Sequence, residues 1–225
     1  MVYFTTSWDD GNKLDTKIAC LLKEYGFDGT FYIPIKYEMR TLKDVQIKKI
    51  SKNFEIGSHG LSHKILTHLE KKTAEVELIS SKKILAGIIR RSVSSYAYPF
   101  GKFNKISAVY VRNAGYKFAR TSDEFSLNAG DPFMSKITLR ASNNFSKFLH
   151  LKFLHLLVKS DFKWNKLAKI IFKNCVRTSI FHLTGHSYDL KKENFEEELI
   201  DFFDYVKKFD FMPITNSQIL KVIAR

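Results

Sequence analysis

Short apolar segments alternate with longer segments of helical periodicity along most of the chain. The apolar segments are rich in β-branched and aromatic residues, which is typical of buried strands. The longer segments place apolar residues three and four positions apart, which is typical of amphipathic helices. In segment 14–25, for example, Ile18, Leu21 and Leu22 share one face, and Gly26 follows as a helix-ending glycine.

This pattern predicts an α/β fold. Strands are predicted over 2–7, 30–35, 54–57, 94–98, 116–120, 136–140, 179–184 and 211–214. Helices are predicted over 14–25, 42–53, 69–90, 105–114, 195–208 and 216–224, with one or two more within 144–173. Repeated strand–helix alternation favours a parallel sheet or barrel with the helices outside. No repeat, low-complexity segment or linker interrupts it, so we expect a single domain over residues 1–225.

Composition narrows the class of protein. A chain of 225 residues that is 44% hydrophobic can bury one substantial core. Cys20 and Cys175 provide neither a disulfide framework nor zinc-ligand spacing, so we expect two buried free thiols. No apolar stretch reaches the ~18 residues of a membrane span. The first residues lack the features of a signal peptide. The predicted location is therefore the cytoplasm.

The formal net charge of +14, from 37 Lys+Arg against 23 Asp+Glu, admits three kinds of partner: nucleic acid, a membrane surface or an anionic substrate. The lysines are scattered along the whole chain, mostly on predicted exposed helix faces. Only 88–91 and 190–192 form small clusters. We therefore expect no nucleic-acid partner and leave an anionic substrate open.

Polar residues follow several of the predicted strands. In parallel α/β folds, functional residues lie at the carboxyl ends of strands, which meet at one end of the sheet. Asp9 and Asp10 follow the first strand, and His59 and His63 follow the third. The same end is expected to carry Tyr98, Pro99, Phe100, Arg120, His182 and His186.

His59 and His63 are spaced for one metal ion, since residues four apart share a face of a helical turn. Alone, such a pair can also consist of two unrelated surface histidines. We expect His68 to be a surface histidine of that kind. Likewise, Asp-Asp-Gly alone is typical of a turn with an aspartate capping a helix. Together, Asp10, His59 and His63 could supply three ligands to a divalent cation, leaving Asp9 as a base. Such a site hydrolyses bonds by activating water.

In this order the motifs resemble those of the polysaccharide deacetylase family, also called the NodB-homology or carbohydrate esterase family 4 domain. Its first motif, Thr/Ser-Phe-Asp-Asp-Gly, is similar to 7–11 (SWDDG), and its second, His-Ser/Thr-x-x-His, to 59–63 (HGLSH). Its third, Arg-x-Pro-Tyr/Phe-Gly, is similar to 97–101 (AYPFG), except that Ala97 replaces the arginine. Its fifth, an apolar residue, any residue and His, is similar to 180–182 (IFH). The fourth motif, with Asp and Trp, is not recognisable.

The resemblance implies a distorted (β/α) barrel that removes N- or O-acetyl groups from a sugar. It also implies a divalent metal, most often zinc, with Co²⁺, Ni²⁺ or Mn²⁺ as alternatives. By this resemblance Asp10, His59 and His63 bind the metal, and Asp9 is the general base. A backbone N–H of the third motif, here that of Phe100, helps to hold the oxyanion.

Two positions leave alternatives open. Arg120 could take the place of the arginine missing at Ala97, or it could be an ordinary surface arginine. His182 matches the spacing of the fifth motif, whereas His186 would lie nearer the mouth of the barrel. We expect one of the two histidines, with a preference for His186, to protonate the leaving group, and the other to be structural. Tyr98 is expected at the substrate side.

The predicted function is a metal-dependent deacetylase for an acetylated sugar, in surface-polysaccharide or lipopolysaccharide biosynthesis. A second interpretation is hydrolysis of a non-sugar amide on the same barrel, because a fold does not fix a substrate. A third is an iron oxygenase with two histidines and one carboxylate, in which Asp9 would have no evident role. A fourth is a degenerate barrel that binds glycan without catalysis.

Overall fold

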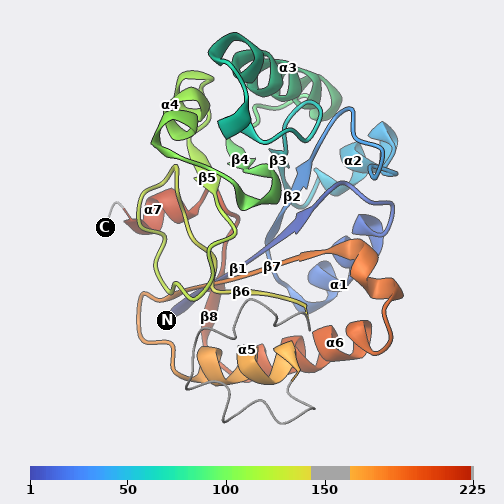
Figure 1. Ribbon diagram of the computed structural model, residues 1–225. Helices are drawn as coiled ribbons and strands as arrows, with labels where there is room; N and C mark the ends of the chain where they lie inside the picture. Colours follow the sequence, from blue (N-terminus) through green and yellow to red (C-terminus); the bar gives the residue numbers. More distant parts are fainter. Residues whose placement is uncertain (143–162, 224–225) are drawn as a thin grey trace.

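A parallel sheet curls around the centre of the molecule, and helices cover its outer side (Figure 1). The computed structural model describes residues 1–142 and 163–223. The strand order is β5-β4-β3-β2-β1-β7-β6, and β8 pairs with the first part of β1. All of these pairings are parallel. This arrangement confirms the predicted distorted (β/α) barrel.

The strands and helices follow the predicted alternation. The strands are β1 (Val2–Asp9), β2 (Gly29–Ile33), β3 (Glu55–Ser58), β4 (Ser95–Ala97), β5 (Phe118–Arg120), β6 (Leu139–Arg140), β7 (Ile180–His186) and β8 (Phe211–Pro213). The helices are α1 (Asp15–Tyr25), α2 (Asp44–Ile50), α3 (Lys71–Ile89), α4 (Lys105–Asn113), α5 (Trp164–Lys173), α6 (Phe195–Val206) and α7 (Ile219–Ile223). Short 3₁₀ turns include η1 (Leu66–His68), η2 (Pro99–Gly101) and η5 (Ser187–Lys191). Each strand and helix predicted within the described residues is present with shifted boundaries, whereas the prediction for 144–162 lies outside them.

The longest pairing joins β1 and β7. It runs in register from Tyr3 beside Ile180 to Asp9 beside His186. The prediction ended this strand at residue 184, but β7 extends two residues further because β1 offers it a partner along its full length. As a result, His186 lies beside Asp9 at the carboxyl end of the sheet.

The segment 132–141 fills the space between β5 and β7. Arg120 pairs with Ser135 in an isolated parallel bridge. Further along, the Thr138 N–H donates to the His182 carbonyl (3.0 Å) and the Ala141 N–H donates to the Thr184 carbonyl (2.8 Å). This irregular segment satisfies the backbone groups of the sheet edges, so the barrel interior is bounded on this side as well.

A layer of phenylalanines packs against the outer side of β1. Phe4 is fully buried, and the ring centroids of six other phenylalanines lie 4.8–6.5 Å from that of Phe4. These are Phe27, Phe172, Phe181, Phe202, Phe203 and Phe211. Such pairs add to the free energy of burying the rings. They give rigid support to β1, the strand that carries Asp9 and leads to Asp10.

The prediction of buried cysteines was wrong. Cys20 is exposed and Cys175 is half-buried, and both are free thiols. Helix α1 buries Ile18, Ala19 and Leu22, which turns Cys20 to the solvent side. Among the described residues, no helix is long and apolar enough to cross a membrane.

Candidate functional site

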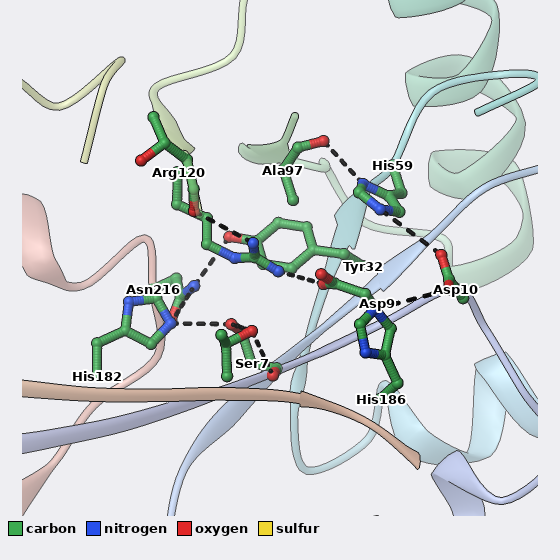
Figure 2. Close-up of polar contacts among 12 residues, drawn as sticks. Ser7, Asp9, Asp10, Tyr32, His59, Ala97, Arg120, His182, His186 and Asn216 are labelled. Atoms are coloured by element: carbon green, nitrogen blue, oxygen red, sulfur yellow. Dashed lines mark hydrogen bonds and ion pairs between the residues drawn. The ribbon is translucent and has the colours of Figure 1, made fainter. Parts of the chain in front are cut away.

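Side chains from three strand ends meet at the mouth of the barrel (Figure 2). Asp9 ends β1 and Asp10 follows it, while β7 ends at His186. His59 and His63 lie in the loop that follows β3. The carboxyl ends of these strands therefore bring together residues that are distant in the sequence, as predicted for a parallel sheet.

Asp10, His59 and His63 form one buried cluster. Asp10 Oδ1 lies 3.3 Å from His63 Nε2 and 3.7 Å from His59 Nε2. One ligand atom from each residue lies within 4.8 Å of the other two. The cluster predicted from the sequence is therefore present as a geometric arrangement.

The local structure around the two histidines differs from the prediction. They lie in an irregular loop and not on a helical turn. His63 has a φ of 57°, in the left-handed region, so the chain turns sharply at this residue. The two imidazoles therefore converge because of this turn. The prediction that they share one face of a helical turn was wrong.

Both imidazoles are held as neutral ligands. His59 Nδ1 lies 2.8 Å from the Ala97 carbonyl, to which it donates, so Nε2 presents its lone pair towards Asp10 (Figure 2). Burial lowers the pKa of His59 to about 3. Burial also lowers the pKa of His63 below its ordinary value. Neutral imidazole is the form that binds a metal ion.

The surroundings of Asp10 fit a cation. Burial, reinforced by the negative charge of Asp9, raises the pKa of Asp10 to about 7. Tyr188 Oη donates to Asp10 Oδ2 (3.3 Å), but Oδ1 makes no hydrogen bond with any described residue. A buried carboxylate oxygen facing two neutral nitrogens is unfavourable by itself and favourable around a positive ion. Two imidazoles and one carboxylate are also a common ligand set for catalytic zinc.

Asp9 has a different partner from its neighbour. Arg120 Nη2 donates to Asp9 Oδ1, and the two form an ion pair. Burial alone would raise the pKa of Asp9, but the positive charge of Arg120, with smaller contributions from His59 and His186, holds it well below the ordinary value. Asp9 is therefore ionised at neutral pH.

Arg120 is an interior residue. It is 1% exposed, and its guanidinium carbon lies 4.9 Å from the ring centroid of Tyr32. In the pairing of β4 with β5, Arg120 lies directly beside Ala97. The alternative of a surface arginine is therefore excluded, and the guanidinium lies next to the position where the third motif lacks its arginine.

The two late histidines occupy different depths of the barrel. His186 is at the mouth, with Nε2 3.7 Å from Asp10 Oδ2 and 21% of its side chain exposed. His182 is buried four residues earlier in β7, two strand repeats below, where its Nε2 lies 2.9 Å from Ser7 Oγ and 3.3 Å from Asn216 Nδ2. The structure thus brings His186, and not His182, to the cluster.

Of the three residues expected from the third motif, Phe100 lies at the cluster. Its ring centroid is 4.7 Å from that of His63, and the residue is 62% exposed. Pro99 is buried at the start of η2. The expectation for the Tyr98 side chain was wrong: it is buried in the core, where its hydroxyl donates to the Phe133 carbonyl (2.9 Å).

Three further residues support the cluster and were not predicted. Tyr37 stacks on His63 with ring centroids 4.2 Å apart, and Tyr188 stacks on His186 at 4.9 Å. Glu77 of α3 is buried and accepts hydrogen bonds from the backbone N–H (2.8 Å) and hydroxyl of Ser62, within the histidine loop. The only sequence signal for any of them is the acidic Glu77 on the buried face of a helix.

Backbone strain is concentrated at the same place. Asp10, His63 and Phe100 have φ values of 73°, 57° and 56°, in the left-handed region that non-glycine residues rarely adopt. Each such residue costs about 1–3 kcal/mol, and its persistence requires support from the surroundings. Hydrogen bonds such as those of Glu77 to the histidine loop supply that support.

Comparison with protein families agrees with the geometry. A family model described as polysaccharide deacetylase matches residues 1–119. The matched part contains Asp9, Asp10, His59 and His63, whereas Arg120 and His186 follow it. A comparison with curated protein sequences gave no match.

Solved structures share the fold. A putative polysaccharide deacetylase from Mycobacterium smegmatis has a TM-score of 0.72 at 15% identity, over 99% of this chain and 91% of that one. The peptidoglycan deacetylase PdaC from Bacillus subtilis has a TM-score of 0.62 at 15% identity, over 99% and 92%. A family 4 acetyl xylan esterase from Clostridium thermocellum, in complex with a cobalt ion, has a TM-score of 0.63 at 12% identity, over 99% and 92%.

Proposed function

The chain belongs to the polysaccharide deacetylase family, and on that premise we propose that it is a metal-dependent hydrolase that removes an acetyl group from an acetylated sugar. One observation carries the proposal. The buried cluster of Asp10, His59 and His63 lies beside an ionised aspartate, Asp9, that a buried arginine holds in place.

Asp10, His59 and His63 would hold the cation. Their donor set suits zinc, and Co²⁺, Ni²⁺ or Mn²⁺ are alternatives. The cobalt ion in the Clostridium esterase supports a divalent metal in this fold. When bound, such an ion lowers the pKa of a water molecule and polarises the acetyl carbonyl.

Asp9 is the proposed general base. Its ion pair with Arg120 keeps it deprotonated and fixes the direction of its carboxylate. It would take the proton of the attacking water as the new bond to the acetyl carbon forms. The Arg120 guanidinium acts here as a positioning group, because it contacts Asp9 and not the substrate.

Phe100 and His186 would complete the reaction. The backbone N–H of Phe100 would donate to the oxyanion that develops on the acetyl oxygen. His186, partly exposed beside Asp10, would donate its proton to the departing nitrogen or oxygen of the sugar. Acetate and the deacetylated sugar are the products.

The proposed biological setting is the biosynthesis of a surface polysaccharide or lipopolysaccharide, with a glycan precursor as substrate and the cytoplasm as the site of action. Family membership supports an acetylated carbohydrate. The structural similarity to a T48 deacetylase with substrate, at 17% identity and a TM-score of 0.64, supports the fold only.

The test is an acetate-release screen with protein whose bound metal has been measured. Acetylated oligosaccharides and nucleotide-sugars are compared with linear acetamides of similar size. We expect acetate from at least one sugar and much less from the linear amides. Release from linear amides alone would favour the non-sugar amidase, and glycan binding without any acetate release would favour a non-catalytic barrel.

A further inference from the structure

We propose that Arg140 forms an anion-binding subsite beside His186, and that the substrate is an acetylated sugar that also carries a carboxylate or phosphate group. This inference rests on the proposed function and names the class of sugar. It follows from the place of Arg140 in the sheet, its charge environment and its lack of a carboxylate partner.

Strand alternation places the Arg140 side chain inside the barrel. Arg140 pairs with Thr184 of β7, and neighbouring residues in adjacent strands point to the same face. The Thr184 hydroxyl faces inward, since it accepts a hydrogen bond from Ser7 Oγ (3.2 Å), which also contacts His182. His186, two residues after Thr184, shares that face. Arg140 is therefore diagonal to His186 at the carboxyl end of the sheet.

The charge environment agrees with this placement. Burial is the largest influence on the pKa of both His186 and Asp10. The positive charge of Arg140 is among the smaller influences on both, and it favours loss of the proton in each case. The direction of this influence agrees with a guanidinium near the mouth, and the pairing of β6 with β7 carries the placement itself.

Arg140 has no carboxylate partner for its side chain among residues 1–142 and 163–223. By contrast, Arg120 pairs with Asp9 and Arg40 pairs with Asp44. Glu124 Oε1 accepts from the backbone N–H of Arg140 (2.8 Å). Arg140 is half-buried, so a ligand can reach it. An accessible guanidinium without a carboxylate partner among the described residues is suited to a planar, two-point contact with a carboxylate or phosphate group.

The proposed chemistry decides which part of the substrate lies near Arg140. His186 delivers its proton to the leaving group, which is the sugar, whereas Phe100 serves the acetyl oxygen. Arg140 is therefore on the sugar side of the scissile bond, where an anionic substituent of the same or the next ring can reach it. The net charge of +14 also favours encounter with an acidic sugar.

The test compares three sugars that carry the same acetamide group. One is neutral, methyl N-acetylglucosaminide, and two are anionic, its C6-carboxylate analogue and N-acetylglucosamine 1-phosphate. With metal-replete protein, we expect kcat/KM for at least one anionic compound to exceed that for the neutral one by about 10- to 100-fold, the range for a hydrogen-bonded charge pair. Arg140→Gln should remove this preference, so that the ratio of kcat/KM for the anionic compound to that for the neutral one falls to about one. The matched control is Arg177→Gln, because Arg177 is exposed just before the start of β7, at the opposite end of the barrel.

Binding of the same compounds to metal-free protein is measured by calorimetry, so that the subsite is tested apart from catalysis. Tighter binding of an anionic compound that is lost in Arg140→Gln and kept in Arg177→Gln supports the subsite, even if no acetate is released. Equal binding and equal rates for all three compounds, unaffected by Arg140→Gln, would overturn the inference while the deacetylase proposal stands. Arg140-dependent binding without acetate release from any acetylated sugar would overturn the deacetylase proposal alone.

Discussion

Arg120 reaches Asp9 from the strand next to the one on which the third motif would carry its arginine. Ala97 of β4 and Arg120 of β5 lie side by side in the sheet. Because neighbouring residues of parallel strands share a face and a level, a guanidinium from either position can reach the same carboxylate. The arginine missing from the motif is thus replaced in space, and the Asp9 ion pair is retained.

Replacing Arg120 should leave Asp9 protonated over more of the pH range. Arg120→Gln removes the charge that depresses the pKa of Asp9, so this pKa should rise. A base works only when deprotonated, so activity is present above its pKa and lost below it. The acid limb of the pH profile of kcat/KM should therefore move to higher pH, with turnover at neutral pH reduced by about 10²-fold.

The geometry also predicts a rescue. In the double variant Ala97→Arg/Arg120→Ala, the guanidinium returns from the neighbouring strand, and part of the lost activity should return with it. Circular dichroism checks that each variant is folded, because an uncompensated buried carboxylate costs about 3–5 kcal/mol. An acid limb that does not move in folded Arg120→Gln would contradict the assigned role.

Removing a metal ligand should remove the metal. His63→Ala deletes one of three protein ligands and should lower zinc affinity by at least about 10²-fold, measured with a competing chelator. The control is His68→Ala, since His68 is exposed at the end of the same loop. Full zinc occupancy in His63→Ala would show that the ion binds elsewhere.

The two late histidines should differ in what they control. His186→Ala should lower hydrolysis of an N-acetyl substrate far more than that of a nitrophenyl acetate, because an amine needs a proton to depart and nitrophenolate does not. His182→Ala should instead lower stability, since it removes the partner of Ser7 and Asn216 in a buried network. Equal amide rates for wild type and folded, metal-loaded His186→Ala would exclude His186 as the acid.

Asp15 should make the metal-free protein less stable as pH rises. This residue of α1 is fully buried, and burial, only partly offset by Ser187, raises its pKa well above the ordinary value. Above pH ~4 the unfolded chain releases a proton that the folded protein keeps, so stability falls by at most about 1.4 kcal/mol per pH unit until the folded pKa is reached.

Asp15→Asn removes this dependence. The variant should be more stable than wild type at neutral pH. The difference should shrink as the pH falls towards ~4, the pKa of an aspartate in the unfolded chain. Urea midpoints at several pH values measure it, and the exposed Asp210, changed to Asn, is the control. A midpoint of Asp15→Asn at or below that of wild type at neutral pH would contradict the prediction.

The sequence allowed the prediction of features that depend on local order. Alternating strand and helix patterns were sufficient for a parallel sheet or barrel, and the family resemblance indicated the distorted barrel. The carboxyl ends of β1 and β3 carry Asp9, Asp10, His59 and His63 as expected. Asp9, Asp10 and His59 lie at or directly after the ends of their strands, so their placement needs only the direction of each strand, whereas the place of His63 depends on the turn in the loop.

Features that depend on register or on loop conformation were not predictable in the same way. The pairing of Arg120 with Asp9 requires β4 and β5 in one register, and the interior position of Arg140 requires the pairing of β6 with β7. Tyr98 precedes Pro99 in the motif, yet its side chain turns into the core to reach the Phe133 carbonyl. Tyr188 and Glu77 reach the cluster through tertiary packing, which local sequence order does not specify.

The central claim is that the Asp10–His59–His63 cluster and Asp9 together release acetate from a sugar. The most direct measurement is a titration of zinc into metal-free protein while acetate release from an acetylated oligosaccharide is followed, for wild type and for Asp9→Asn. We predict that the wild-type rate rises until one equivalent of zinc is bound and then levels off. Asp9→Asn should bind the same equivalent and remain about 10²- to 10⁴-fold slower. Acetate release at the wild-type rate from zinc-loaded Asp9→Asn, or from metal-free wild type, would contradict the account.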